Sequence, residues 1–243
     1  MGRSTVTTKR PLLISFSGLD GSGKSTQIEN LQQRLTLAGL NVKLLAFWDD
    51  VVVGKRYREG FVHKVYQSEK GIGTPGKPVN RRDKNVRAWY LTILRHFLYL
   101  LDAINLRRVL RHKFNSDANV IIMDRYIYDE LANLPLQSSL TRAFVKMVRK
   151  LTPEPDLPYL LDTDVEAAHA RKPEYPIDFM HKCRAAYFNL AQIPGTLVII
   201  PALPLNEAKD AVVTVCDKAI LARELGVSLE QLGIERKIGA PAA

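Results

Sequence analysis

The sequence predicts a three-layer α/β fold, in which a doubly wound parallel sheet lies between two layers of helices. Short apolar runs rich in β-branched residues alternate with helical patterns along most of the 243 residues, as expected for parallel strands joined by crossover helices. The first run also enters a glycine-rich loop directly, which is the setting of a phosphate-binding loop. The strands are expected at 12–17, 41–47, 119–123, 158–161 and 196–200, and the helices at 24–38, 84–113, 137–151, 164–171, 178–192 and 205–225.

The first strand, "PLLISFS" (11–17), leads into a phosphate-binding motif. The pattern G-x-x-x-x-G-K-[ST] is matched by Gly18, Gly23, Lys24 and Ser25. In this motif backbone N–H groups turn inward around phosphate oxygens, the lysine reaches the β- and γ-phosphates, and the hydroxyl can ligate Mg²⁺. The alternative is a glycine-rich turn that contains Lys-Ser by chance, but the order of strand, loop and helix favours a phosphate site. The phosphate contacts are expected from Gly18, Gly21, Ser22, Gly23, Lys24, Ser25 and Thr26.

The second strand (41–47) is separated from the next helix by a long segment without periodicity, and residues 66–83 are expected to form a mobile loop. The helix at 84–113 is apolar nearly all round, which predicts that it is buried. Two of its few polar residues, Arg95 and Asp102, are seven positions apart and therefore share one face. They could grip a polar acceptor together, or they could be satisfied by structural partners inside the fold.

The third strand ends in "NVIIMDRY", where Asp124 and Arg125 follow the apolar run. The carboxyl ends of parallel strands are where such a sheet presents functional groups. A carboxylate here can hold Mg²⁺ together with Ser25, and the arginine can clamp anionic oxygens. The alternative is a structural Asp–Arg pair at a strand end, but the phosphate loop favours a functional role.

These motifs together resemble the thymidylate kinase family of nucleoside monophosphate kinases. The matching stretches are "FSGLDGSGKSTQ" (16–27), "MDRY" (123–126), "PDLPYLLDTDVEAAHAR" (155–171) and "DFMHKCRAAYFNLA" (178–191), and the resemblance spans roughly residues 12–215. It implies a P-loop kinase fold with a five-stranded parallel sheet, helices on both faces and a short closing lid. It also implies a homodimer built on the long helices.

The motifs and the resemblance predict an enzyme that transfers the γ-phosphoryl group of MgATP to a nucleoside monophosphate, dTMP or a related nucleotide. The resemblance gives Asp20 a role near the acceptor sugar, and closure of the lid at about 171–177 would exclude water. The expected catalytic residues are Lys24, Arg125 and Arg171, the expected metal ligands are Ser25 and Asp124, and the expected acceptor-binding residues are Asp20, Arg95 and Asp102.

The sequence also departs from the family on the acceptor side. The family has an arginine shortly after the second strand, but "FWDDVVVGKRYREG" contains none before Arg56. The family's long helix carries a second arginine on the acceptor side, and at its place this sequence has Asp102 or Ala103. The lid is also several residues shorter than is usual in the family. Two alternatives therefore stay open: a kinase of the same fold acting on a deoxynucleoside or on a non-nucleotide acceptor such as a sugar-linked phosphate, and a non-catalytic ATP-binding protein.

Length and composition predict one kinase domain over 11–225, with tails at 1–10 and 226–243. No apolar run approaches the length of a membrane span. The two cysteines have neither disulfide nor metal-ligand spacing, which fits the cytoplasm. The net charge of +10, concentrated in 54–113, would attract polyanionic nucleotides. Nucleic acid is not favoured as a partner, because no aromatic-interleaved binding motif accompanies the charge.

Overall fold

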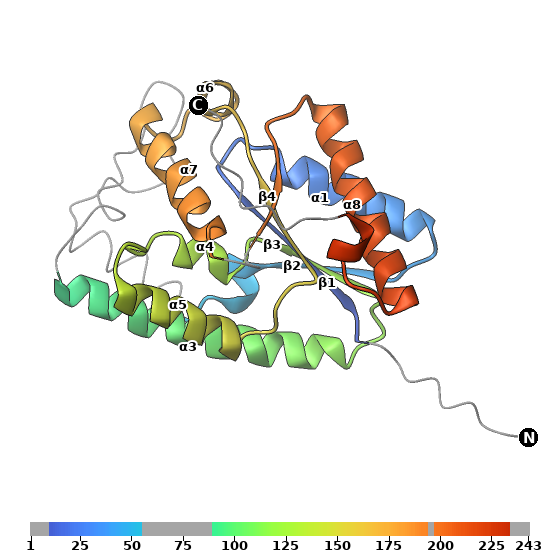
Figure 1. The fold of residues 1–243 in the computed structure, drawn as a ribbon, viewed down its shortest axis with the longest axis horizontal. Coiled ribbons are helices and arrows are strands. Elements are labelled where there is room, and N and C mark those ends of the chain that lie inside the picture. Colours follow the sequence, from blue (N-terminus) through green and yellow to red (C-terminus); the bar gives the residue numbers. More distant parts are fainter. Residues whose placement is uncertain (1–9, 55–88, 194–196, 234–243) are drawn as a thin grey trace, which may run out of the picture.

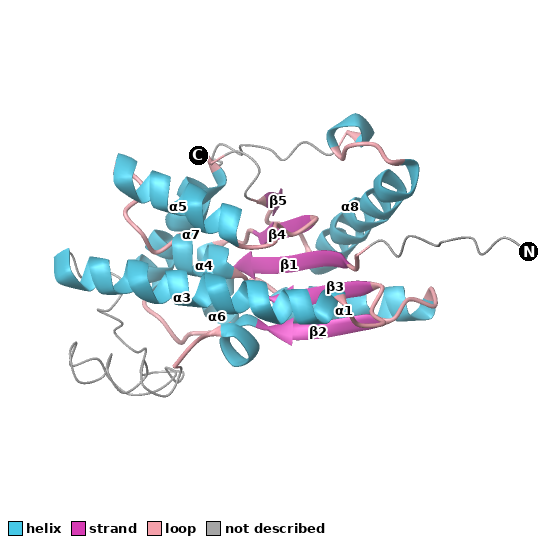
Figure 2. Ribbon diagram, turned by 90° about the horizontal axis from the view of Figure 1, so that it is seen from below, coloured by secondary structure: helices cyan, strands magenta, loops and turns pink. Residues whose placement is uncertain are grey.

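The computed structural model describes residues 10–54, 89–193 and 197–233, and within them the chain forms a five-stranded parallel sheet. The strands are β1 (Leu12–Gly18), β2 (Val42–Ala46), β3 (Val120–Asp124), β4 (Leu157–Leu161) and β5 (Val198–Ile200). Their order is β2-β3-β1-β4-β5, so the chain reverses its direction of winding at β1. All seven residues of β1 are buried, because this strand is central and both its faces are covered (Figures 1 and 2).

Helices cover both faces of the sheet, and each face has its own apolar core. On one face α1 (Lys24–Leu37) and α8 (Leu205–Leu225) pack over alternate strand residues such as Ile14 and Ile122. On the other face the intervening residues, such as Leu13 and Ile121, pack under the remaining helices. These are α3 (Trp89–Phe114), α4 (Ile127–Leu131), α5 (Ser139–Leu151), α6 (Val165–Arg171) and α7 (Ile177–Ala191). The predicted doubly wound three-layer fold is confirmed.

The expected long helix appears as α3, but the prediction that it is buried is wrong for one of its faces. Ile93, Phe97 and Ile104 are 60%, 56% and 38% exposed, whereas Ala103, Leu106 and Leu110 are fully buried. A helix at the rim of a three-layer fold packs on the sheet with one side only, so an apolar sequence all round does not bury all of it. The expected loop at 66–83 and residues 84–88 of the expected helix lie outside the described residues.

Three short elements do not appear among the sequence predictions: α4, a one-turn π-helix η1 (Phe47–Val51) directly after β2, and a 3-10 helix η3 (Glu230–Leu232) after α8. Each is too short to show a full helical period. None of the described helices is long and apolar enough to cross a membrane.

Candidate active site

The phosphate loop connects β1 to α1 at the carboxyl edge of the sheet, and close contacts dictate its glycines. A Cβ atom on Gly18 (φ 141°) would lie 2.6 Å from the carbonyl oxygen of Leu161, at the end of β4. A Cβ atom on Gly21 (φ 82°) would lie 2.5 Å from the carbonyl oxygen of Ala168 in α6. Both glycines therefore combine a left-handed backbone with an approach that no side chain fits.

Helix α1 begins at Lys24, directly after the loop, so its N-terminus faces the loop. No side chain of the described residues caps it, and its first turn holds no acidic residue. The first N–H groups of a helix have no partner within the helix, and the helix dipole adds positive potential there. Loop and helix together thus offer the backbone donors that an anionic phosphate group needs.

The side chain of Lys24 is buried against the phosphate loop. Its ammonium group donates to the carbonyl oxygens of Gly18 at 3.0 Å and Leu19 at 2.6 Å, and it lies 3.9 Å from the carboxylate of Asp20. Burial, followed by the nearby Arg125 cation, lowers the pKa of Lys24 from 10.5 to about 8. An anion entering the loop would favour the charged form, so phosphate binding and protonation of this lysine are coupled.

Asp124 ends β3 beside the loop. Its Oδ1 atom is buried and accepts no hydrogen bond from any residue that the structure describes. A buried carboxylate oxygen in that position is suited to a cation or to a metal-bound water. The described residues contain no cluster of three or more acidic, histidine or cysteine side chains that could hold a metal. The donor set fits Mg²⁺, which takes one or two protein oxygens and completes its shell with phosphate and water.

Arg125 leaves the strand with a backbone conformation that is rare for a side chain of its size. Its φ is 66°, and its N–H donates to the carbonyl oxygen of Phe16 at 2.9 Å, so the backbone is fixed against β1. A non-glycine residue in the left-handed region costs about 1–3 kcal/mol and persists only where its surroundings hold it. Such outliers gather at functional sites, and here the outlier belongs to a predicted catalytic residue.

Two carboxylates hold the Arg125 side chain. Its Nη2 pairs with Asp20 of the phosphate loop, and its Nη1 donates to Asp129 of α4 at 3.0 Å. Burial opposes the charge on the guanidinium, but the neighbouring groups, Asp129 foremost, outweigh burial and raise the pKa of Arg125 above its ordinary value. The structure thus brings Lys24, Asp20 and Arg125 together at the phosphate loop.

The predicted lid lies between α6 and α7. Arg171, the last residue of α6, donates from Nη2 to Oγ1 of Thr163 at 2.8 Å, just beyond the end of β4. Tyr175 is buried against Phe179 with ring centroids 5.5 Å apart. The lid is therefore anchored at both ends, and α6 also touches the phosphate loop at Gly21.

Arg184 and Asp162 form an ion pair that ties α7 to the end of β4. Arg184 donates from Nε and Nη2 to the two carboxylate oxygens, both at 2.7 Å. These hydrogen bonds raise the pKa of Arg184. The guanidinium also lies 4.9 Å from the ring centroid of Phe188. A two-point pair of this kind fixes the direction of the helix that follows the lid.

The three predicted acceptor-binding residues, Asp20, Asp102 and Arg95, lie in different surroundings. Asp20 faces Lys24 and Arg125, as described above. Asp102 is fully buried, and its Oδ1 accepts the backbone N–H of Val53 at 2.9 Å, in the segment that follows η1. Arg95 lies two turns earlier on α3 and is partly exposed. The contact of Asp102 favours the structural alternative for this residue, and a role of either residue towards the acceptor stays a prediction.

Sequence reasoning missed Asp129 and its partners Ser17 and Tyr187. The carboxylate of Asp129 accepts from the Ser17 hydroxyl at 2.6 Å and from the Tyr187 hydroxyl at 2.7 Å, in addition to Arg125. The one available signal was the spacing of four residues between Arg125 and Asp129, which suits an ion pair on one helical turn.

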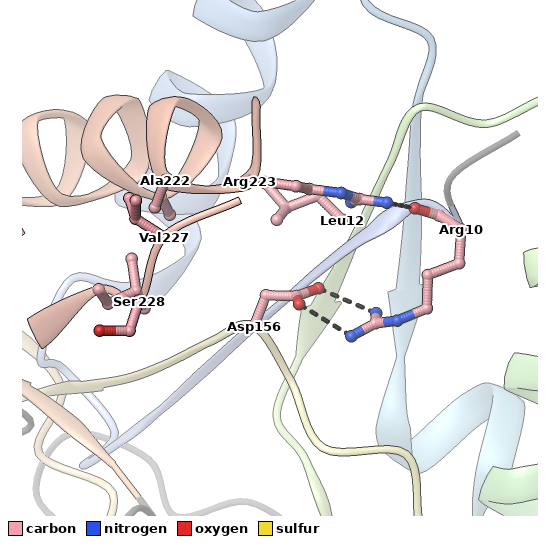
Figure 3. Close-up of a pocket in the computed structure, with 9 residues that line it drawn as sticks. Arg10, Leu12, Asp156, Ala222, Arg223, Val227 and Ser228 are labelled. Atoms are coloured by element: carbon pink, nitrogen blue, oxygen red, sulfur yellow. Dashed lines mark hydrogen bonds and ion pairs between the residues drawn. The ribbon is translucent and has the colours of Figure 1, made fainter. Parts of the chain in front are cut away.

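A pocket of about 470 Å³ lies at the opposite edge of the sheet and is distinct from the phosphate loop. Figure 3 shows Arg10 and Asp156, two residues that line it, joined by hydrogen bonds of 2.8 and 2.9 Å, while Arg223 donates to the Arg10 carbonyl oxygen. Leu12 in its wall begins β1, whereas Gly18 ends it. Arg10 pairs with Asp156, and Arg223 donates to a backbone carbonyl oxygen, so this pocket does not resemble the phosphate loop.

Comparison with known proteins gives a consistent result. No family model matches the chain. It is 30% identical over 184 residues to the "Probable thymidylate kinase" of Methanobrevibacter smithii, covering 74% of this chain and 80% of that protein. It is 27% identical to the protein of the same name from Methanosphaera stadtmanae, over 81% of this chain and 92% of the other. A "Thymidylate kinase" of Bifidobacterium longum subsp. infantis is 29% identical over 74% of each chain.

A solved structure shares the fold. The crystal structure of thymidylate kinase from Ehrlichia chaffeensis superposes with a TM-score of 0.52 at 18% sequence identity, covering 86% of this chain and all of the other. At that identity the likeness concerns the fold alone.

Proposed function

This chain belongs to the thymidylate kinase family, and from that premise we propose that it transfers the γ-phosphoryl group of ATP to thymidylate. It is an enzyme, a nucleoside monophosphate kinase. The observation that supports the reaction most directly is the convergence of Lys24, Asp20 and Arg125 at the carboxyl edge of the sheet. This arrangement offers a buried ammonium and a half-buried guanidinium beside a cradle of backbone donors, which is what a transferring phosphoryl group requires.

Charge neutralisation and positioning account for most of the chemistry of phosphoryl transfer. We assign the phosphates of ATP to the loop at 18–26, with Lys24 against the β- and γ-phosphates. Arg125, held at the end of β3, would contact the oxygens of the transferring group. Arg171 would reach the same group from the lid, once its hydrogen bond to Thr163 is exchanged for the phosphate. The anchored lid would then keep water away from the reacting phosphorus.

We assign Mg²⁺ to Ser25 and Asp124. The buried Asp124 oxygen, which has no hydrogen-bond partner among the described residues, and the hydroxyl of the exposed Ser25 are oxygen ligands of the kind that this cation accepts. When bound with ATP, the cation supplies charge neutralisation of the phosphates.

On the acceptor side we propose that Asp20 binds near the sugar of thymidylate, with Arg95 on α3 facing the same space. The family relationship favours this acceptor over a deoxynucleoside or a non-nucleotide phosphate. A non-catalytic ATP-binding protein is also disfavoured, since binding alone does not require Arg125 beside the loop or a basic lid.

We further propose a homodimer and a cytoplasmic location. Ile93, Phe97 and Ile104 form an exposed apolar stripe along α3, and such a stripe is costly in water unless a partner covers it. A second copy of the chain suits it, because identical apolar surfaces related by a twofold axis cover each other. A chain with only two cysteines and no disulfide spacing suits a reducing compartment.

The test of the proposed function is ADP release from purified protein with MgATP against a panel of nucleoside monophosphates and free deoxynucleosides. We expect thymidylate to give the highest kcat/KM. Lys24→Ala should abolish turnover, whereas Lys43→Ala should not, since Lys43 pairs with Asp117, which precedes β3 at the amino ends of the strands, opposite the phosphate loop. Fast turnover of a deoxynucleoside instead, or an active Lys24→Ala variant, would refute the assignment.

A further inference from the structure

Asp129 is a buried carboxylate beside the site that accepts four hydrogen bonds, and the assigned chemistry does not use it. It is the third residue of the short helix α4, and its side chain is only 4% exposed. Oδ1 accepts from Arg125 at 3.0 Å and from Tyr187 at 2.7 Å. Oδ2 accepts from the Ser17 hydroxyl at 2.6 Å and from the Tyr126 N–H at 3.1 Å.

These four donors match the four lone-pair positions of an ionised carboxylate. A buried carboxylate is costly unless it is both paired with a cation and hydrogen-bonded, and Asp129 meets both conditions. An amide in its place would bring two N–H donors to a position where every neighbour also donates. The surroundings therefore suit a charged carboxylate, and a neutral amide of the same shape would lose part of these hydrogen bonds.

The two carboxylates around Arg125 differ in a way that gives them different roles. Asp20 lies on the glycine-rich loop, and its side chain is 30% exposed, so it can exchange with solvent or with a substrate. Asp129 is inaccessible and is fixed to β1 through Ser17. One end of the guanidinium is thus anchored in the protein interior, while the other faces the loop where phosphates would enter.

Asp129 also connects this anchor to the helix that follows the lid. Tyr187 lies on α7, ten residues after the start of that helix, and its hydroxyl is buried against Asp129. Ser17, Arg125 and Tyr187 belong to β1, the end of β3 and α7. A single carboxylate therefore joins the strand that enters the phosphate loop, the catalytic arginine and the helix behind the lid.

We propose that Asp129 is a positioning residue, which anchors one end of the Arg125 guanidinium and links it to Tyr187 so that the other end meets the transferring phosphoryl group. The proposal rests on the proposed function for its kinetic consequence. The anchoring itself is a property of the folded protein and can be tested without turnover.

The kinetic test is a double-mutant cycle between Asp129→Asn and Arg125→Ala. A misplaced catalytic group can cost about 10²-fold in rate, so Asp129→Asn should lower kcat by about that factor with the KM for ATP little changed. In the Arg125→Ala background the same substitution should have almost no further effect on kcat. Asp156→Asn is the matched control, because Asp156 also holds an arginine and a backbone N–H, at the opposite edge of the sheet.

The second readout is the NMR signal of the Arg125 guanidinium, assigned by its loss in Arg125→Ala. We expect restricted rotation, with separate Nη resonances, in the wild type and in Asp156→Asn, and averaged resonances in Asp129→Asn. If Asp129→Asn does not fold, Tyr187→Phe removes one donor to the same carboxylate and keeps the ring, and its cycle with Arg125→Ala should show the same non-additivity at a smaller amplitude.

The outcomes separate the two proposals. A wild type that turns over nothing would contradict the proposed function, and the guanidinium signal would then decide the anchoring alone. Restricted rotation that persists in Asp129→Asn would overturn the anchoring. An equal fall in kcat in both backgrounds would overturn the positioning role, because Asp129 would then act independently of Arg125.

Discussion

At the scale of single residues, the site is a chain of alternating charges. Lys24, Asp20, Arg125 and Asp129 follow one another through ion pairs, so the two cations are balanced by two carboxylates. The two carboxylates thereby stabilise the buried ammonium of Lys24 and the half-buried guanidinium of Arg125 in the fold. The inner partner, Asp129, is buried, whereas the outer partner, Asp20, is 30% exposed.

The lowered pKa of Lys24 should be visible in the pH dependence of stability. The folded pKa is about 8 and the ordinary value is 10.5, so between these values the unfolded chain binds more protons than the folded one. Stability should therefore rise with pH over this window, as the cost of burying the charge is relieved. We expect the wild type to gain stability relative to Lys24→Met between pH 8 and 10.5 in urea denaturation, and parallel profiles of the two proteins would contradict this.

The left-handed backbone of Arg125 predicts that replacing this residue by glycine costs less stability than replacing it by alanine. Arg125→Ala and Arg125→Gly both remove the guanidinium and should both lower kcat by about 10²–10³-fold. Glycine relieves the backbone strain at φ 66°, so the glycine variant should be more stable than the alanine variant by roughly 1 kcal/mol. Urea denaturation of the two variants measures the difference, and an alanine variant of equal or greater stability would show that the backbone is not strained here.

At the scale of elements, the phosphate loop, α6 and α7 act as one assembly. α6 approaches the loop at Gly21, its last residue reaches back to the end of β4, and the Arg184–Asp162 pair ties α7 to the same strand end. The segment predicted to form the lid is therefore bounded by two helices that are already held next to the loop.

Because α6 approaches the phosphate loop closely, alanine substitutions at two glycines with the same φ should cost different amounts of stability. Gly21 and Gly39 both have a φ of 82°, but only at Gly21 would a Cβ atom meet another backbone, that of Ala168. Gly39→Ala should cost about 1 kcal/mol of stability from backbone strain alone and leave turnover intact. Gly21→Ala should cost more and abolish turnover. Equal losses of stability and activity in the two variants would argue against the contact between α6 and the loop.

Much of the element structure could be predicted from the sequence, because it depends on local pattern. Each of the five strands lies within two residues of its predicted position, and the helix predicted at 205–225 is α8. The short helix α4 was missed, since five residues show no helical period. The exposed side of α3 was missed because an apolar sequence does not reveal which of its faces a neighbouring layer covers.

At the scale of the whole molecule, the reversal of winding at β1 creates the site. Strands β3 and β4 lie on either side of β1, so the phosphate loop, Asp124 and the residues after β4 meet at one edge although they are far apart in sequence. The motifs predicted that the loop, Asp124 and Arg125 belong together. They could not predict the pairing of Asp129 with Tyr187, which depends on how α7 packs against α4 and leaves no trace in local spacing.

If the exposed apolar stripe on α3 forms the dimer interface, a charged side chain introduced into it should dissociate the dimer. Phe97→Glu places a carboxylate in the middle of the stripe and should shift the protein to a monomer in light scattering. Leu37→Glu is the control, since Leu37 is 89% exposed on α1, in the opposite helix layer, and should leave the assembly unchanged. A wild type that is already monomeric, or a dimer unaffected by Phe97→Glu, would contradict the proposed interface.

The most direct test of the central claim is to follow the phosphoryl group itself. The protein would be incubated with thymidylate, Mg²⁺ and ATP labelled at the γ-phosphate, and the products separated. We predict that the label appears in thymidine diphosphate, and that Lys24→Ala forms none. Label released only as inorganic phosphate, or retained in ATP while thymidylate stays unchanged, would contradict the assignment of this site to thymidylate phosphorylation.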